Sequence, residues 1–553
     1  MHDDPPDRVT ASGSPGRDRA PHAAVWPSWA PPPTGAPPIG APTTRARAGI
    51  YGPPAYRASG GSGPAGQPAR RSRLQPVGVS GLVLITTMTH APLVMLWSIM
   101  PTTYQFSGVV ATPLVFGIGG AALLVFAVAY GGLARRIRHS GGLYAFVTHG
   151  LGPTVGLGVA TLAVLSYSVL LSGALVLLAG VLTSSVGSLL GIDLPVPISV
   201  VVAVVAVLVL GRLQLRTLSR IYLALAASQV LAVLWLDFGS ATTPDGGQVS
   251  YDAIDPAWLL GGSFSLALCL ALTSFMGSET GANYADELAE PRRTVPRATL
   301  ISYAFSAVVL LISGWAISVA TGPEKAVSIA QGSYESAIGG NGQPLLLAVV
   351  GRLVGPEHVT TVVHLLTAAL ALGALGTSAS IHHSVARQIA ALARDGILPP
   401  ALAARRDGGT PIRAGWFAPL IAGPLAFLAV SVDNTAVALV VGILGGLGIV
   451  AALALTSLAA IVYFLRGAEE DETGFLGWEG HMVAAAFALV VTGFVFVYAL
   501  IRLPSVLVVV APAAGWLFPV CLGGAFGAGV VWALVLRTTR PEVLGRLGRS
   551  DPA

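Results

Sequence analysis

The sequence is poor in charge and almost without cysteine and lysine. Only 10% of its 553 residues are Asp, Glu, Lys or Arg, whereas about a quarter of the residues of a soluble domain are charged. Hydrophobic residues make up 54% of the chain, and the mean hydropathy is +0.73. This composition excludes a soluble globular protein and indicates one that is embedded in a lipid bilayer.

The scarcity of cysteine argues against thiol-based sites. Cys269 and Cys521 both lie in apolar stretches, which disfavours a disulfide framework and a metal site built on thiolates. The adjacent His382 and His383 do not replace such a site, because neighbouring residues of a helix point about 100° apart, whereas paired metal ligands on a helix stand four residues apart. We therefore predict no metal site and no cofactor.

The net charge of +5 is carried by arginine, since Lys325 is the only lysine. The arginines cluster at the ends of apolar stretches rather than in one patch, so nucleic-acid binding is not expected. Residues 1–76 are rich in Pro, Gly, Ala, Ser and Arg and contain few large apolar residues. We predict that they form a disordered cytoplasmic tail rather than a signal peptide, because no short apolar core follows a basic start.

Twelve stretches are apolar and long enough to cross a bilayer, which takes about 20 residues for each helix. They lie near 79–101, 108–134, 154–186, 195–211, 217–237, 258–286, 297–320, 358–386, 413–431, 434–464, 481–501 and 511–536. The sequence thus predicts an all-α polytopic membrane protein. Residues 77–465 would hold the first ten helices, 466–538 two more, and 539–553 a second cytoplasmic tail.

The arginine-rich loops alternate along the chain. Arginines precede the first span and recur in every second loop, as at Arg135, Arg212 and Arg292, whereas the intervening loops contain Arg352 and Arg502 alone. Because cytoplasmic loops are enriched in Lys and Arg, we expect both termini in the cytoplasm and the protein in the plasma membrane.

Two of the predicted spans contain residues that interrupt a helix. In the first, Pro92 has no amide proton and clashes with the preceding turn, which predicts a kink or unwinding at Thr89-His90-Ala91. In the sixth, the break falls at Gly277, between Ser274 and Ser278. Either break alone would favour a simple kink between packed helices. The two spans are equivalent if the first ten helices form two halves of five, and such matched breaks indicate the binding site of a secondary transporter.

The stretch after the second break resembles a family signature. Phe275 to Ala298 reads F-M-G-S-E-T-G-A-N-Y-A-D-E-L-A-E-P-R-R-T-V-P-R-A, which is similar to the sixth-helix signature of the amino acid–polyamine–organocation permeases. Three more stretches agree in order, namely S-G-G-L-Y-A-F-V with H-G-L-G (140–152), V-A-R-Q-I-A-A-L-A-R-D-G-I-L-P (385–399) and G-T-P-I-R-A (409–414). The resemblance covers about residues 80–465, and T-H-A-P-L and I-H-H-S-V-A-R are most similar to an actinobacterial-type branch.

This resemblance implies an inverted repeat of five plus five helices, the LeuT-like fold, with two extra C-terminal helices. It further implies uptake of amino acids or related amines by alternating access, coupled to protons or by exchange. Helices 1 and 6 would line the substrate pocket, and residues of helices 3 and 8 at a similar depth would close its sides. The candidates are Thr87, Met88, Thr89, His90, Ala91, Phe275, Met276, Gly277, Ser278, Tyr167, Thr377 and Ser378. Ser278 stands where members often have an aromatic residue, and Gln229 falls about where some have a lysine in helix 5.

Ionisable residues within membrane spans are costly, so each is a functional candidate. His90 can exchange a proton near neutral pH, or it can remain a neutral imidazole that bonds the carbonyls freed by the first break. Glu279 follows the second break, where a carboxylate would satisfy orphan amide groups. We favour that structural role for Glu279 over a role as a proton carrier or as the partner of a substrate ammonium.

Charged residues gather at the predicted cytoplasmic ends of helices 6 and 8. We predict that they form ion pairs that open and close an inner gate, although a solvated loop is an equally good interpretation for any single member. The candidates are Asp286, Glu287, Arg292, Arg293, Arg387, Arg394 and Asp395.

We therefore predict a secondary transporter rather than an enzyme. An enzyme acting on lipid-linked substrates would need catalytic residues in sizeable loops, and the loops here are short and contain no H-E-x-x-H or nucleophile motif. A membrane sensor or channel remains a further alternative. The expected partners are a small-molecule substrate, the lipid bilayer and a coupling ion. Coupling to protons is usual in the family, while hydroxyls at Thr377, Ser378 and Ser380 would suit Na⁺.

Overall fold

The computed structural model describes residues 77–337, 344–405, 410–431, 435–466, 477–507 and 514–549. Within these ranges every regular element is a helix, apart from an isolated bridge between Val77 and Leu288. The all-α prediction is confirmed. The predicted tail at 1–76 and the last four residues, 550–553, lie outside the described residues.

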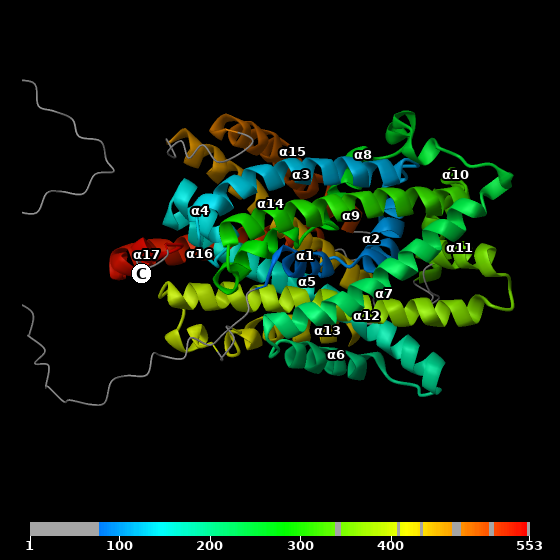
Figure 1. Cartoon of the computed structure of the whole chain (residues 1–553), viewed down its shortest axis with the longest axis horizontal. Coiled ribbons are helices and arrows are strands. Elements are labelled where there is room, and N and C mark those ends of the chain that lie inside the picture. Colours follow the sequence, from blue (N-terminus) through cyan, green and yellow to red (C-terminus); the bar gives the residue numbers. More distant parts are fainter. Residues whose placement is uncertain are drawn as a thin grey trace, which may run out of the picture. The chain divides into compact units, whose positions relative to one another are not determined.

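The first half of the chain forms seven α-helices in the described ranges, shown in blue to green in Figure 1. They are α1 (Val79–Met88), α2 (Pro92–Ser107), α3 (Thr112–Arg136), α4 (Leu143–Leu151), α5 (Pro153–Leu190), α6 (Val196–Leu210) and α7 (Leu215–Thr242). Helices α1 and α2 are the two parts of the first predicted span.

Short 3-10 helices alternate with α-helices in the second half. The 3-10 helices are η1 (Asp245–Gly247), η2 (Asp252–Ile254), η3 (Pro256–Leu260), η4 (Ser278–Glu287), η5 (Pro400–Ala403) and η6 (Ala414–Trp416). The α-helices are α8 (Phe264–Thr273), α9 (Pro291–Thr321), α10 (Pro323–Ala337), α11 (Pro344–Val354), α12 (Val359–Arg394), α13 (Phe417–Ser431), α14 (Thr435–Leu465), α15 (Trp478–Leu507), α16 (Ala514–Thr539) and α17 (Pro541–Arg546).

The helices account for the predicted spans. Ten helices in the described part of the chain are long and apolar enough to cross a membrane, with the α1–α2 pair counted as one. The remaining two predicted spans correspond to α6, which has 15 residues, and to the interrupted pair α8 and η4. Helices α10 and α11, between the seventh and eighth spans, were not predicted, because they are short and lie in a stretch with polar residues and two prolines.

Most helices of the first half pack on their counterparts in the second, with α7 and α14 as the exception. Helix α3 contacts α9, α5 contacts α12, and α6 contacts α13, while α1 contacts η4 and α2 contacts α8. Figure 1 shows α3 and α9 running side by side. Small residues permit this approach, since a Cβ added to Gly120 of α3 would lie 2.3 Å from the Cβ of Ala307 on α9. The pairing is that expected of two related halves packed face to face.

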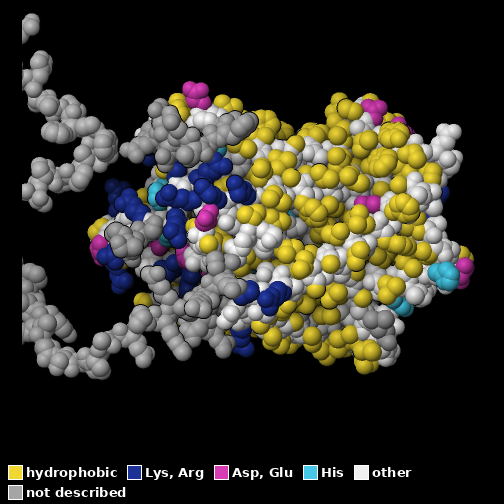
Figure 2. Space-filling view, in the orientation of Figure 1, with side chains coloured by type: hydrophobic (Ala, Val, Ile, Leu, Met, Phe, Trp, Pro, Cys, Tyr) yellow, Lys and Arg dark blue, Asp and Glu magenta, His cyan; other side chains and the backbone are white. Residues whose placement is uncertain are grey.

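Charge and apolar side chains are segregated on the surface. Figure 2 shows Lys and Arg side chains gathered at one end of the helices and hydrophobic side chains covering the middle. We call the first region the arginine-rich end; α3, α12 and α16 finish there, at or close to Arg136, Arg394 and Arg537. Large hydrophobic side chains such as Leu231 and Val490 are about two-thirds exposed, at 68% each. A belt of this kind matches a lipid-facing surface.

Candidate functional site

The first predicted break is present. Helix α1 ends at Met88 and α2 begins at Pro92, with a turn closed by a 3.1 Å hydrogen bond from the His90 amide to the Thr87 carbonyl. Proline is well suited to the first position of a helix because it has no amide proton to satisfy. No described side chain caps α2. Its first amide groups, at Leu93 and Val94, therefore lack a partner within the helix.

The second predicted break is also present. Helix α8 ends at Thr273, and the chain turns through Ser274 to Gly277 before η4 begins. Gly277 has φ +123°, a conformation that residues with a Cβ rarely adopt. A Cβ at this position would lie 2.3 Å from Cγ2 and 2.5 Å from Cβ of Thr89. The two breaks are thus in direct contact, and only glycine allows it.

Glu279 satisfies the backbone at the second break. Its carboxylate accepts the Gly277 amide at 3.0 and 2.9 Å and the Tyr303 hydroxyl at 2.9 Å. The Tyr167 hydroxyl donates to the same carboxylate. Glu279 is 1% exposed. This arrangement matches the capping role favoured from the sequence, and it directs Tyr167 to Glu279 rather than to a pocket.

Tyr130 supports the same backbone and was missed by the sequence analysis. Its hydroxyl donates to the Glu279 carbonyl at 2.5 Å and accepts the Ala282 amide at 3.2 Å. A tyrosine in an apolar span is usually a packing residue, and nothing in its local sequence distinguishes it. Three tyrosines from α3, α5 and α9 therefore hold η4 in place.

We expect Glu279→Gln to destabilise the folded protein. Hydrogen bonds to a charged group contribute roughly 1.5–3 kcal/mol each, and the substitution weakens those from Gly277 and Tyr303. The melting temperature in detergent should fall, and Tyr303→Phe should produce a smaller fall. An unchanged melting temperature together with unchanged ligand binding would argue against the capping role.

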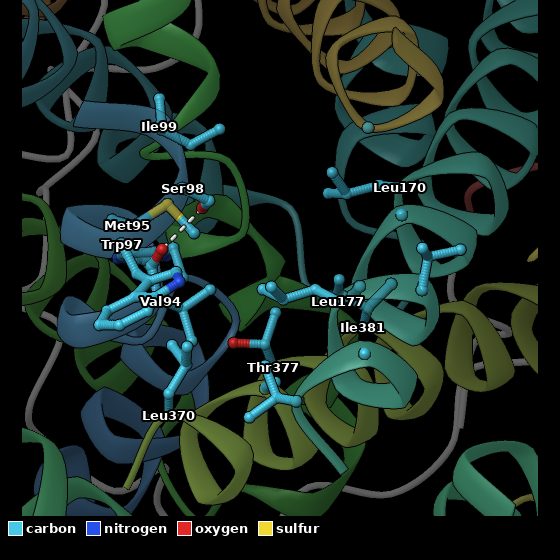
Figure 3. Close-up of a pocket in the computed structure, with 18 of the residues that line it drawn as sticks. Val94, Met95, Trp97, Ser98, Ile99, Leu170, Leu177, Leu370, Thr377 and Ile381 are labelled. Atoms are coloured by element: carbon cyan, nitrogen blue, oxygen red, sulfur yellow. Dashed lines mark hydrogen bonds between the residues drawn. The ribbon is translucent and has the colours of Figure 1, made fainter. Parts of the chain in front are cut away.

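A cavity of about 540 Å³ adjoins the two breaks. Thr89, His90 and Met276 line it at the breaks, and its walls come from α2, α5, α12 and α14. Leu347 of α11 and Ser184 of α5 line it on the side away from the arginine-rich end. In Figure 3, Val94 and Met95 lie across the cavity from Leu170 and Leu177, with Thr377 between them.

Four of the twelve predicted pocket residues line this cavity, namely Thr89, His90, Met276 and Thr377. The other eight do not, and they are Thr87, Met88, Ala91, Phe275, Gly277, Ser278, Tyr167 and Ser378. Several of these join the helices instead. The Thr87 hydroxyl donates to Ser302 at 3.3 Å, and a Cβ on Gly376 would lie 2.3 Å from Cε of Met88.

His90 is held by the seventh span rather than by freed carbonyls. Its Nε2 atom forms a 2.8 Å hydrogen bond with the Ser306 hydroxyl of α9. Its Nδ1 atom has no hydrogen-bond partner among the described residues, and the side chain is 3% exposed. His90, which lines the cavity, therefore keeps one buried ring nitrogen without a partner among the described residues.

Helix α12 clamps the first break. The Ser380 hydroxyl donates to the Ile85 carbonyl at 2.7 Å and forms a 2.8 Å hydrogen bond with Thr89. The Thr377 hydroxyl accepts the Ala91 amide at 3.5 Å. Gln229, the residue at the place of the helix 5 lysine, donates to the Ala369 carbonyl of α12 at 2.6 Å. It thus ties α7 to α12.

The predicted ion pairs form at the arginine-rich end. Arg387 binds Glu287 in a bidentate pair, with Nε–Oε1 at 2.8 Å and Nη2–Oε2 at 2.9 Å. The guanidinium also lies 4.4 Å from the centre of the Tyr284 ring and donates to the His383 carbonyl at 3.0 Å. Arg387 is fully buried. This pair joins η4 to α12 directly below the breaks.

A second pair lies closer to the surface. Asp286 binds Arg394 at 2.6 Å and Arg405 at 2.8 Å, and Arg394 also donates to the Ser140 hydroxyl. The predicted members Arg292 and Arg293 are not joined to α12 by any ion pair in the described residues, and Arg293 pairs locally with Glu290 at 3.6 Å. Both are in the first turn of α9 and are exposed.

Asp395 has partners that the sequence analysis did not identify. Its carboxylate bonds Nε2 of His139 at 3.1 Å, the Tyr144 hydroxyl at 3.0 Å and the amide of Gly548 at 2.9 Å. These groups come from the loop before α4, from α4 itself and from the segment after α17. Asp395 therefore joins the end of α12 to α4 with its preceding loop and to the segment after α17, rather than to one of the predicted arginines.

A separate charged cluster lies at the opposite end of the helices. Asp245 binds Lys325 of α10 at 2.5 Å and Arg352 of α11 at 2.6 Å. These hydrogen bonds hold the pKa of Asp245 below its ordinary value. The cluster, which we call the outer clamp, links the loop after α7 to α11 and thus to Leu347 in the cavity wall.

The fold and site together define a class of protein. It is a polytopic helical membrane protein with a cavity at two touching helix breaks, and with a buried ion pair between that cavity and one end. The family model for amino acid permeases matches residues 80–524. The chain belongs to this family of transporters, which lies within the amino acid–polyamine–organocation superfamily. A search of curated proteins gave no match.

Proposed function

We propose that the protein is a secondary active transporter that moves an amino acid or a related small amine across the plasma membrane by alternating access. The observation that carries the proposal is the cavity of about 540 Å³ at the contact between the two helix breaks. Broken helices at equivalent positions of two halves mark the substrate site of secondary transporters. The arginine-rich end would face the cytoplasm, with both termini.

The two breaks offer complementary groups to a zwitterion. The amide groups of Leu93 and Val94 open α2, where a helix dipole favours an anion. The Gly277 amide at the other break is already taken by Glu279. A substrate carboxylate is therefore assigned to the start of α2. The ammonium group would lie against the carbonyls that end α8.

The arrangement of the cavity and gate corresponds to an outward-facing state. The lining residues come from the half of the helices away from the arginine-rich end, for example Ser184, Leu347 and Val363. The pairs Glu287–Arg387 and Asp286–Arg394 close the other side. Release to the cytoplasm would require both pairs to separate, with rotation of the chain at the end of α1 and at the start of η4.

Uptake into proteoliposomes tests this function. Purified full-length protein should accumulate radiolabelled amino acids, and an imposed inward pH gradient should increase the accumulation if protons are the coupling ion. A sodium gradient with equal effect would assign coupling to Na⁺, which the hydroxyls of α12 would suit. The absence of uptake and of counterflow for all amino acids and amines would contradict the proposal.

The His90→Ala variant tests whether His90 takes part in proton coupling or only in structure and substrate binding. If His90 carries the coupling proton on its Nδ1 atom, the substitution should reduce proton-driven uptake by about tenfold or more, a typical effect of losing a positioned proton acceptor. Counterflow exchange, which needs no net proton movement, should be largely retained. Equal losses in the two assays would leave His90 with only a structural role through Ser306.

A further inference from the structure

We propose that the transported molecule carries a large apolar side chain, as do the branched-chain and aromatic amino acids. This inference rests on the proposed function and specifies its substrate class. It follows from the chemistry of the cavity wall, the state of the hydroxyl groups in that wall and the space that glycines leave open.

The wall beyond the breaks is apolar. Leu170 and Leu177 of α5 lie opposite Val94 of α2 (Figure 3), and Ile381 of α12 and Ile443 of α14 line the same space. None of the described residues that line the cavity is Asp, Glu, Lys or Arg. A charged substrate side chain would lose its hydration there without gaining an ion-pair partner, which is strongly unfavourable.

Three hydroxyl groups of the wall are engaged with their own helices. Ser98 donates to the Val94 carbonyl at 2.6 Å, Thr367 to the Val363 carbonyl at 2.7 Å, and Thr273 to the Leu270 carbonyl at 2.7 Å. Their protons are therefore not available to a substrate. A polar side chain such as that of asparagine would find few donors along these walls, whereas an apolar side chain needs none.

Polar groups concentrate where the substrate's head group would lie. Thr89 and His90 at the first break and Thr377 on α12 form one end of the cavity. The Thr377 hydroxyl faces the Ala91 amide, and His90 keeps one ring nitrogen without a partner among the described residues. The site thus has one polar end, suited to an α-amino and α-carboxyl group, and a long apolar remainder.

Glycines keep that remainder wide. Gly180 on α5 and Gly442 on α14 both line the cavity, and a Cβ added to either would meet nothing within 4 Å. The volume of about 540 Å³ accommodates a bulky side chain together with the head group. A small substrate such as alanine would leave much of the apolar wall in contact with water.

The first test compares amino acids with the purified full-length protein in proteoliposomes. Leucine, phenylalanine, alanine, lysine and glutamate are used as labelled substrates and as competitors. We expect leucine or phenylalanine to be taken up with a KM at least about tenfold below that of lysine and glutamate, in line with the discrimination that an apolar pocket provides. Uptake of lysine or glutamate with an equal KM would overturn this inference alone. No uptake of any of the five, together with no uptake in the wider panel above, would overturn the proposed function itself.

The second test fills the cavity. Gly180→Leu and Gly442→Leu would each extend a side chain into the open space, one from α5 and the other from α14. Both should raise the KM for phenylalanine by about tenfold and raise that for alanine much less. Gly187→Leu is the matched control, because Gly187 lies on the same helix, is exposed and does not line the cavity. Equal effects of Gly180→Leu and Gly187→Leu, or equal effects on the two substrates, would contradict the inference.

Discussion

Glu287→Gln should abolish most transport and lower the melting temperature sharply. The substitution keeps the shape of the side chain but leaves the fully buried guanidinium of Arg387 without its bidentate carboxylate. Removing one partner of a buried ion pair costs roughly 3–5 kcal/mol, because the remaining charge stays desolvated. Loss of this ion pair also favours states in which η4 and α12 are separated, which should disturb the alternation between the outward-facing and inward-facing states. Uptake in proteoliposomes and the melting temperature in detergent measure the two effects.

The exposed pair Glu290–Arg293 provides the matched control. Its side chains are 67% and 75% exposed and lie 3.6 Å apart, and such pairs contribute only about 0–1 kcal/mol. Glu290→Gln should therefore leave both uptake and melting temperature nearly unchanged. The exchange Glu287→Arg with Arg387→Glu should recover part of the stability lost in the single variant. Equal behaviour of Glu287→Gln and Glu290→Gln would show that the buried pair is not a gate.

Gly277→Ala should reduce transport and the melting temperature nearly as much as Glu287→Gln. The new Cβ would lie 2.3 Å from Cγ2 of Thr89, and overpacking of this kind costs about 1–3 kcal/mol. The backbone at φ +123° adds a further cost of about 1–3 kcal/mol for a residue that is not glycine. The contact between the breaks would open, and the cavity beside Thr89 and Met276 would change shape. We expect loss of ligand-induced stabilisation together with a lower melting temperature.

A second substitution separates the two causes of that loss. Thr89→Gly in the Gly277→Ala background removes both Thr89 carbon atoms that the new Cβ would meet, Cγ2 and Cβ, and should restore a part of the stability, while the backbone strain remains. Gly493→Ala on α15, where a Cβ meets nothing within 4 Å, is the control and should be neutral or slightly stabilising. Full activity of Gly277→Ala would mean that the breaks need not touch for transport.

The helix breaks and the charged pairs were predictable because they depend on local chemistry. Pro92 has no amide proton to donate and Gly277 is free to take a positive φ, and the sequence positions of the breaks agree with the ends of α1 and α8. Glu287 and Arg387 were both among the charges predicted at the ends of helices 6 and 8, so their pairing required only that the two helices be neighbours.

The lining of the cavity was less predictable because it depends on the rotation of each helix. Tyr167 was chosen for its depth in the membrane, but depth does not specify the direction in which a side chain points, and Tyr167 turns to Glu279. Phe275 and Ser278 flank the break and are fully buried, but neither lines the cavity. Leu170 and Leu177, which do line the cavity, are indistinguishable in sequence from the other leucines of α5.

Partners brought together from distant segments were not predictable at all. Tyr130 reaches the backbone of η4, and His139 reaches the end of α12, although neither lies near its partner in sequence. The outer clamp likewise depends on α10 and α11, whose short helices gave no signal as membrane spans.

Lys325 of the outer clamp offers a single lysine side chain for chemical labelling. Lys325, the sole lysine of the chain, has a side chain that is 66% exposed and sits on Asp245. An amine-reactive fluorophore would therefore attach at one defined side chain, apart from the terminal α-amino group. A dye at that position would report movement of α10 during each transport cycle, and single molecules could be followed without engineered cysteines.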